Sequence, residues 1–224
     1  STSFSCRVGY GAHRGVDAVE RMLRQVSRNG TCPCFALKCD IKKFFDSVDH
    51  KTLIEIIKRK IEDSDCIWLI EKIIKSFEKE RSKGLPLGNV TSQLFANIYL
   101  NELDQFIKHE LKIKYYIRYC DDFVILGESK NELFLTADKI SGFLKYNLSL
   151  FLHSDKIIIR KYRQGIDFLG YVVLPYHRVL RTRTKRRMFR KIDKNNNQSI
   201  QSYLGILSHC NGYEIKKKLL EILK

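Results

Sequence analysis

Two adjacent aspartates interrupt a run of strand-forming residues near the middle of the chain. Asp121 and Asp122, within YCDDFVIL, lie between Tyr115–Tyr119 and Phe123–Leu126, which are rich in aromatic and β-branched residues. This pattern predicts two short strands joined by a turn that carries both carboxylates. An ordinary solvated Asp-rich turn is the simpler interpretation. Because strands flank the pair closely on both sides, however, the carboxylates would be held on rigid elements, which suits a catalytic site.

A second carboxylate-bearing strand precedes this hairpin. Apolar and polar residues alternate in CFALKCDIKKFF (residues 34–45), which predicts a half-buried strand with Asp40 on its polar face. If this strand pairs with the hairpin, three carboxylates meet, and such a cluster is costly unless cations neutralise it. Two Mg²⁺ ions, with Mn²⁺ as a substitute, would supply that charge and would also bind substrate phosphates.

The charge of the chain indicates a polyanionic partner. Lysine and arginine number 41 against 25 acidic residues, a formal net charge of +16, which favours nucleic acid first and an acidic membrane surface second. No apolar run reaches the roughly 18 residues of a membrane span, so we expect no membrane partner. The segment RVLRTRTKRRMFRK (178–191) is either a solvated linker or a surface that grips a phosphate backbone. Carboxylates beside basic residues together predict phosphoryl transfer on a nucleic acid.

The remaining periodicities predict an α+β domain. The seven cysteines, among them Cys32, Cys34 and Cys39, lack the paired spacing of zinc sites, so we expect buried thiols. The chain does not begin with Met and shows no signal peptide, so we expect a fragment or a processed chain. Apolar spacing predicts helices over about 16–26, 49–61, 67–77, from Thr91 or Ser92 onward, and 132–146, and strands over 148–152, 156–160 and 166–174.

With these motifs in order, the chain resembles reverse transcriptases over about residues 6–180. FALKCDIKKFFDSVDH resembles the first palm motif, GLPLGNVTSQLFANIYLNELD the template-and-nucleotide motif, and YIRYCDDFVIL the Y-x-D-D motif. LHSDKIII resembles the lysine-bearing motif that follows, IDFLGYVV the primer-grip hairpin, and CRVGYGAHRGVDAV the finger segment upstream. One Y-x-D-D is a weak signal, whereas several ordered motifs are a strong one.

The resemblance implies a right-hand polymerase: an antiparallel palm sheet with packed helices, partial fingers and a short helical thumb. It implies partial fingers at 1–33, palm at 34–49, a helical insertion of fingers or palm at 50–85, palm at 86–180 and a partial thumb at 181–224. The family's triphosphate-clasping finger residues would lie upstream of residue 1, so the chain would be an incomplete polymerase core. A prokaryotic or phage-encoded cytoplasmic protein is implied.

The resemblance also assigns roles. Asp40 and Asp121 would bind both metal ions with Asp122 in support, Ile41 would contribute a backbone carbonyl, and Lys156 would protonate the leaving pyrophosphate. The implied nucleotide site contains Phe45 as a steric gate against ribose, with Leu87, Gly88 and Gln93. The implied primer and template contacts are Tyr119, Leu169, Gly170, Arg181, Arg183, Lys185, Arg186 and Arg187. The implied partners are template RNA, a primer, their RNA–DNA hybrid, dNTPs and a small basic accessory protein.

Two positions point to a subgroup. Leu87 stands where many such polymerases have Gln, and Gln93 where many have Pro. This combination resembles reverse transcriptases of diversity-generating retroelements, which copy a template RNA with errors at adenines. An amide at position 87 would hydrogen-bond the nucleotide and leucine cannot, so discrimination should loosen. Group II intron, retron and phage-defence reverse transcriptases are the alternatives, together with a catalytically silent RNA-binding module on the same fold.

Overall fold

A four-stranded antiparallel sheet forms the centre of the molecule. The computed structural model describes residues 2–86, 88–192 and 197–223. Its central sheet has the strand order β2-β3-β1-β4, and every neighbouring pair is antiparallel. The strands are β1 (Phe35–Asp40), β2 (Tyr116–Tyr119), β3 (Asp122–Gly127) and β4 (Ile158–Lys161). The predicted pairing of the Asp40 strand with the hairpin is therefore present.

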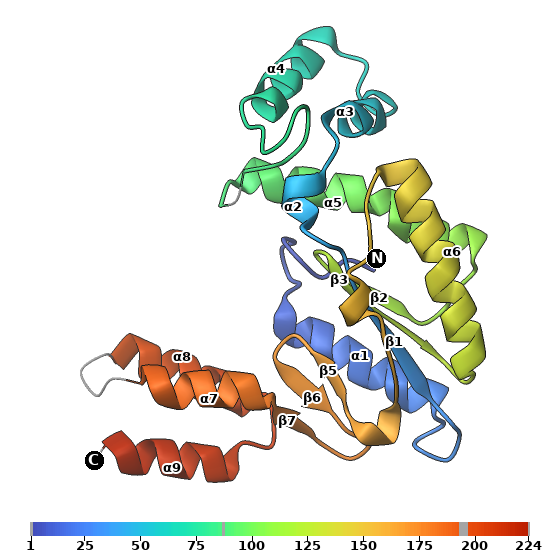
Figure 1. Ribbon diagram of the computed structural model, residues 1–224. Coiled ribbons are helices and arrows are strands. Elements are labelled where there is room, and N and C mark those ends of the chain that lie inside the picture. Colours follow the sequence, from blue (N-terminus) through green and yellow to red (C-terminus); the bar gives the residue numbers. More distant parts are fainter. Residues whose placement is uncertain (1, 87, 193–196, 224) are drawn as a thin grey trace.

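Different helices cover the two faces of this sheet (Figure 1). Leu37 and Phe123 point into a core shared with α5 (Val90–Gln105) and α6 (Lys130–Leu148). Ala36 and Val124, one residue along each strand, point into a second core with α1 (Ala12–Val26). Alternate side chains of a strand face opposite ways, so both layers follow from the alternation in the sequence. Burial on both faces explains why these strands contain few polar residues.

A small second sheet packs against α1. It consists of β5 (Ile166–Phe168), β6 (Tyr171–Val173) and β7 (Arg178–Leu180). Periodicity alone predicted one strand over 166–174, which is wrong; the hairpin implied by the family resemblance is present. The chain reverses at Leu169 and Gly170, whose φ angles are 50° and 89°. Glycine accepts this left-handed geometry without steric cost.

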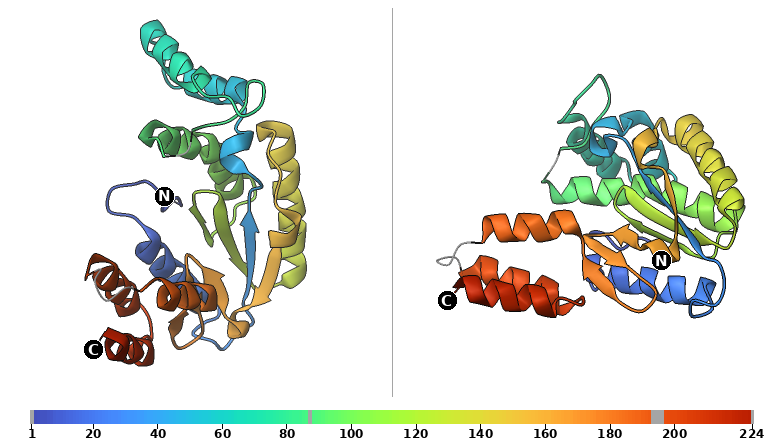
Figure 2. Two further views of the ribbon diagram at one scale, coloured as in Figure 1. Left: turned by 60° about the vertical axis from the view of Figure 1, so that its left-hand side comes forward. Right: turned by 60° about the horizontal axis from the view of Figure 1, so that its bottom comes forward.

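Helices make up the two ends of the molecule. On one side α2 (Phe44–Ser47), α3 (His50–Lys58) and α4 (Ser64–Lys75) extend beyond α5, and on the other α7 (Thr182–Lys191), α8 (Asn197–Ser208) and α9 (Tyr213–Leu223) form a separate group (Figure 2). This second group contacts α1 at the His209 ring, which stacks on His13 with a centroid distance of 3.8 Å. None of the helices within the described residues is long and apolar enough to cross a membrane. The predicted domain boundaries stay predictions.

Several predicted elements differ from the structure for local reasons. The strand expected over 34–45 ends at Asp40, because Lys43 takes the left-handed conformation (φ 45°) before α2. The helix α5 begins at Val90 under an Asn89 cap, rather than after Thr91 or Ser92. The strand expected over 148–152 is the end of α6 and a loop with one bridge, between Ile41 and Leu152. Asp49 caps α3, since its side chain accepts the Thr52 N–H at 2.8 Å.

Candidate active site

Strand register brings the three predicted carboxylates to one end of the central sheet. Asp40, the last residue of β1, pairs directly with Asp122, the first residue of β3. The Ile41 N–H donates to the Asp121 carbonyl at 3.3 Å, which holds the turn against the end of β1. Asp40 and Asp122 extend from the same sheet face as Ala36 and Val124, the side covered by α1. The site is thus built on strand ends.

Two lysines neutralise part of this charge. Lys156, in a short 3-10 helix (Ser154–Lys156), places its Nζ 2.9 Å from Asp40 Oδ2. Lys38, two residues before Asp40 on the same face of β1, places its Nζ 3.2 Å from Asp122 Oδ2. Three carboxylates therefore share two close ammonium groups, and the cluster keeps an excess of negative charge.

Burial, with repulsion between the carboxylates added to it, raises the pKa of Asp121 and of Asp122. Burial raises the pKa of Asp122 to about 6, with repulsion from Asp40 and Asp121 adding to it and Lys38 opposing it. Burial also raises the pKa of Asp121, and the Asp40 charge adds to that shift. The Asp122 Oδ1 atom is buried without a hydrogen-bond partner. Because a buried polar atom normally has a partner, this unpaired oxygen marks the cluster as a candidate functional site.

The donor chemistry of the cluster fits a divalent metal ion. Carboxylate oxygens are the ligands that Mg²⁺ and Mn²⁺ prefer. Within the described residues, no three His, Cys, Asp or Glu side chains stand close enough to hold a metal as they are; Asp40 and Asp122 each face a lysine instead. Metal binding would therefore exchange lysine contacts for metal contacts. The nearby thiols do not compete, because burial raises the pKa of Cys39 to about 12.

The carboxylates open into a groove that continues along α7. A cavity of about 430 Å³ contains Lys38, Asp40, Asp122 and Lys156 in its lining. A larger cavity of about 1180 Å³ lies beyond it, and the two share Arg181 and Arg183. Six of the predicted primer and template residues line this larger cavity: Leu169, Gly170, Arg181, Arg183, Arg186 and Arg187. The basic segment 178–191 is thus a strand and a helix beside the carboxylates, not a loose linker.

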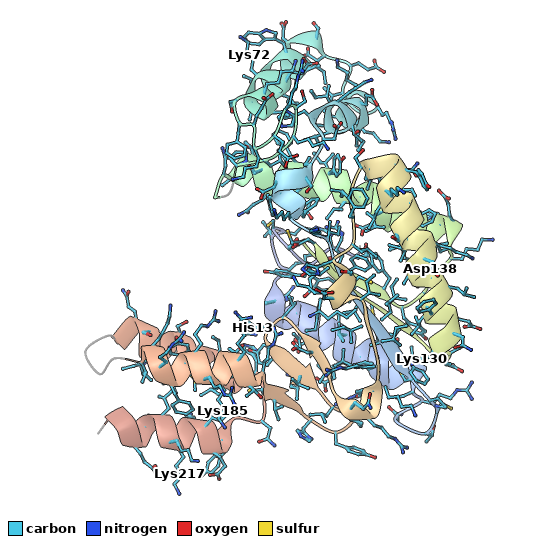
Figure 3. The ribbon with its side chains drawn as sticks, in the orientation of Figure 1. His13, Lys72, Lys130, Asp138, Lys185 and Lys217 are labelled. Carbon is cyan, nitrogen blue, oxygen red and sulfur yellow. The ribbon has the colours of Figure 1, made fainter. Side chains whose placement is uncertain are left out.

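Two other predicted primer contacts lie apart from the groove lining. Lys185 is on α7 (Figure 3) but does not line either cavity. Tyr119 is half-buried at the end of β2 and packs on the α1 core.

None of the predicted nucleotide residues that the structure describes lines the cavity at the carboxylates. Phe45 is half-buried in α2, its ring edge-on to Phe44 at 5.4 Å. Gly88 is exposed with φ 86°. Gln93 is exposed on α5 and lines a different cavity, of about 790 Å³. Leu87 lies outside the described residues.

Sequence reasoning missed three features of the site. Lys38 lies two residues before Asp40 in the alternating segment 34–45, and this spacing is the signal that could have identified it as the partner of Asp122. Asp167 in β5 lines the carboxylate groove, and its Oδ2 accepts from Arg181 Nε at 2.8 Å. A buried ion pair between Asp104 and Arg118 lies on the opposite face of the sheet, and no local pattern indicated it.

Comparison with known proteins decides the family. A family model described as "Reverse transcriptase (RNA-dependent DNA polymerase)" matches residues 7–173. The chain belongs to the reverse transcriptase family. Members of this family generally use divalent metal ions, in keeping with the carboxylate cluster.

Curated relatives extend beyond this chain. "Group II intron-encoded protein LtrA" of Lactococcus lactis is 27% identical, over 80% of this chain and 41% of LtrA. "Protein YkfC" of Escherichia coli is 27% identical, over 82% of this chain and 56% of YkfC. "Putative COX1/OXI3 intron 2 protein" of Saccharomyces cerevisiae is 24% identical, over 72% of this chain and 25% of that protein. The chain thus spans between a quarter and just over half of these relatives.

Solved structures agree on the fold. Apo telomerase from Candida tropicalis, truncated from its C-terminal domain, superposes with a TM-score of 0.60 at 16% identity, over 80% of this chain and 41% of the telomerase chain. This likeness shows a right-hand polymerase fold. The predicted α+β class with an antiparallel palm sheet and packed helices is confirmed.

Proposed function

We propose that this reverse transcriptase chain is the palm-centred part of an RNA-directed DNA polymerase that extends a primer on an RNA template with dNTPs. The observation that carries the proposal is the pairing of Asp40 with Asp122 beside the Asp121 turn, where Asp40 and Asp122 line a groove that also contains Arg181 and Arg183. Membership of the family and likeness to telomerase support it. A telomerase relative was solved with a fragment of telomeric RNA, and we extend RNA binding to this chain as part of the proposal.

In the proposed reaction the aspartates hold two divalent cations, Mg²⁺ or Mn²⁺. When bound, these ions neutralise the phosphates and lower the pKa of the primer hydroxyl. Asp40 and Asp121 fix the position of that charge relative to the sheet, and Asp122 supports them. The primer 3′-hydroxyl loses its proton to solvent, and its oxygen forms a bond to the α-phosphate of the dNTP as the bond to pyrophosphate breaks. Lys156, beside Asp40, donates the proton that the leaving pyrophosphate takes up.

The groove supplies the positioning. Arg181, Arg183, Arg186 and Arg187 line one cavity next to the β5–β6 turn, so a phosphate backbone placed there lies beside the carboxylates. Such contacts act through charge and weaken steeply with salt. A hybrid duplex of A-like form would be held by its shape and backbone rather than by base sequence.

The proposal is tested by primer extension with the full-length gene product on an RNA template, in Mg²⁺ and dNTPs. Wild type should extend the primer and Asp121→Asn should not, while both bind the template–primer. Wild type that binds RNA but makes no DNA would contradict the polymerase and favour the silent RNA-binding module.

For the finer function we propose error-prone copying in a diversity-generating retroelement, with a small basic accessory protein as partner. The support is the sequence L-G-N-V-T-S-Q over residues 87–93. Leu87→Gln should lower misincorporation opposite template adenines; equal error rates in both proteins would contradict this. The second candidate is a group II intron-type enzyme, which the intron-encoded relatives favour, and a gene neighbourhood with an intron rather than a variable-protein gene would support it.

A further inference from the structure

A buried ion pair lies directly behind the turn that carries Asp121. Arg118 of β2 is 1% exposed and Asp104 of α5 is 7% exposed. The guanidinium donates twice to this carboxylate, from Nε to Oδ1 at 2.8 Å and from Nη2 to Oδ2 at 2.7 Å. Tyr116, also buried, donates its hydroxyl to the same Oδ1 at 2.6 Å. The carboxylate is thus fully used, and the bidentate geometry fixes the plane of the guanidinium.

The remaining nitrogen of Arg118 reaches the catalytic turn. Its Nη1 donates to the Cys120 carbonyl at 3.1 Å, and Cys120 is the residue immediately before Asp121. The other backbone group of Cys120 is also held, since its N–H donates to Ser5 Oγ at 2.9 Å. Both peptide groups that flank Cys120 are therefore tied to other parts of the fold.

This turn needs such restraint. Cys120 has φ 56°, in the left-handed region that costs a residue with a Cβ about 1 kcal/mol or more. A strained conformation persists only where its surroundings determine it, and it is common where a side chain must be aimed. Asn97 of α5 joins the same network, because its side-chain amide donates to the Ser5 carbonyl at 3.2 Å. Helix α5 and the N-terminal segment thereby hold the turn from two directions.

We propose that Arg118, held by Asp104, is a positioning residue that sets the height and direction of the Asp121 carboxylate for metal binding. This inference rests on the proposed function, because it takes Asp121 as a metal ligand. Partners that orient a metal ligand typically change metal affinity by about 10–100-fold when they are removed. A pair that only stabilised the fold would leave metal affinity unchanged in the folded protein.

The test uses a double variant that removes the network without leaving a buried charge. Arg118→Met/Asp104→Leu replaces the pair with apolar side chains, an exchange that folded proteins often tolerate. Mn²⁺ affinity of the protein without nucleic acid is measured by electron paramagnetic resonance, and folding by urea titration. We expect a cooperative unfolding transition and a Mn²⁺ Kd raised about 10–100-fold. A Kd within twofold of wild type in a folded double variant would overturn the proposal.

A matched control and a milder variant keep the result decisive. Arg59, at the C-terminal end of α3, forms an exposed ion pair with Glu102 of α5 at 3.0 Å, so Arg59→Met/Glu102→Leu should leave the Kd unchanged. If the buried double variant does not fold, Arg118→Lys keeps the positive charge beside Asp104 but cannot reproduce the three donations from Nε, Nη1 and Nη2, and should raise the Kd several-fold; no change would overturn the proposal. Asp121→Asn separates the two claims. If it binds Mn²⁺ like wild type, the proposed function fails; if it alone weakens binding, only the role of Arg118 fails.

Discussion

Acidic side chains meet basic ones on both faces of the central sheet, and the two places differ in balance. On the α1 face, three carboxylates share two lysines, and Asp122 keeps a buried oxygen without a partner. On the α5 face, one carboxylate meets one arginine in a bidentate pair with every acceptor occupied. The buried pair is balanced in charge, and its free guanidinium nitrogen donates to the Cys120 carbonyl, whereas the carboxylate cluster has more acidic side chains than close ammonium groups. Charge balance thus separates a structural brace from a candidate active site a few residues away.

The largest expected effect is loss of catalysis on the unbalanced side. Asp121→Asn should lower primer extension by at least about 10²–10³-fold, since catalysis there depends on positioned charge. The free energy of unfolding should not fall, because the change relieves repulsion with Asp40. Single-turnover extension and urea titration measure the two effects. Asp138→Asn, on the exposed surface of α6 (Figure 3), is the control and should change neither.

Breaking the buried Arg118–Asp104 pair should, in contrast, lower the free energy of unfolding. Arg118→Met leaves the Asp104 charge buried and unpaired, which should cost about 3–5 kcal/mol of unfolding free energy. Arg59→Met, which breaks an exposed pair between the end of α3 and Glu102 of α5, should cost about 1 kcal/mol or less. Urea titration of both variants tests the contrast. Similar losses of unfolding free energy in the two variants would show that the buried pair stabilises the fold no more than the exposed pair does.

Lys156 should behave as part of the unbalanced cluster. Lys156→Met should slow single-turnover extension about 10²-fold, because it removes the proposed proton donor to pyrophosphate. Its side chain is about half exposed, so stability should change by less than about 1 kcal/mol. The matched change Lys130→Met on α6 should leave the rate unaltered (Figure 3). A rate equal to wild type for Lys156→Met would restrict this lysine to charge neutralisation.

The smallest effect is expected in the groove that extends the cluster. Arg183 lines both cavities, so Arg183→Gln should weaken template–primer binding and reduce the slope of log K against log salt by roughly 1. Lys217→Gln on α9, away from the cavity linings, should leave the slope unchanged. Filter binding across a salt series provides the slopes. Identical slopes for all three proteins would place the nucleic acid elsewhere.

Sequence alone predicted the unbalanced side well, because its determinants are local. Alternation in residues 34–45 placed Asp40 on the polar face, and the flanking strands placed Asp121 and Asp122 at a turn. The buried pair was not predictable in this way, because a single arginine in a strand resembles an exposed residue until its partner on α5 is known. Alternation also misled over 148–152. Leu148, Leu150 and Leu152 are buried alternately, as in a strand, yet Leu150 N–H donates back to Leu144 of α6.

The account depends on a divalent cation at the carboxylate cluster, and anomalous scattering from crystals soaked in Mn²⁺ tests this most directly. The account predicts a manganese peak between Asp40 and Asp121, with the Lys156 ammonium displaced from Asp40. Crystals that show no peak there, with Lys156 still on Asp40 at saturating Mn²⁺, would contradict it.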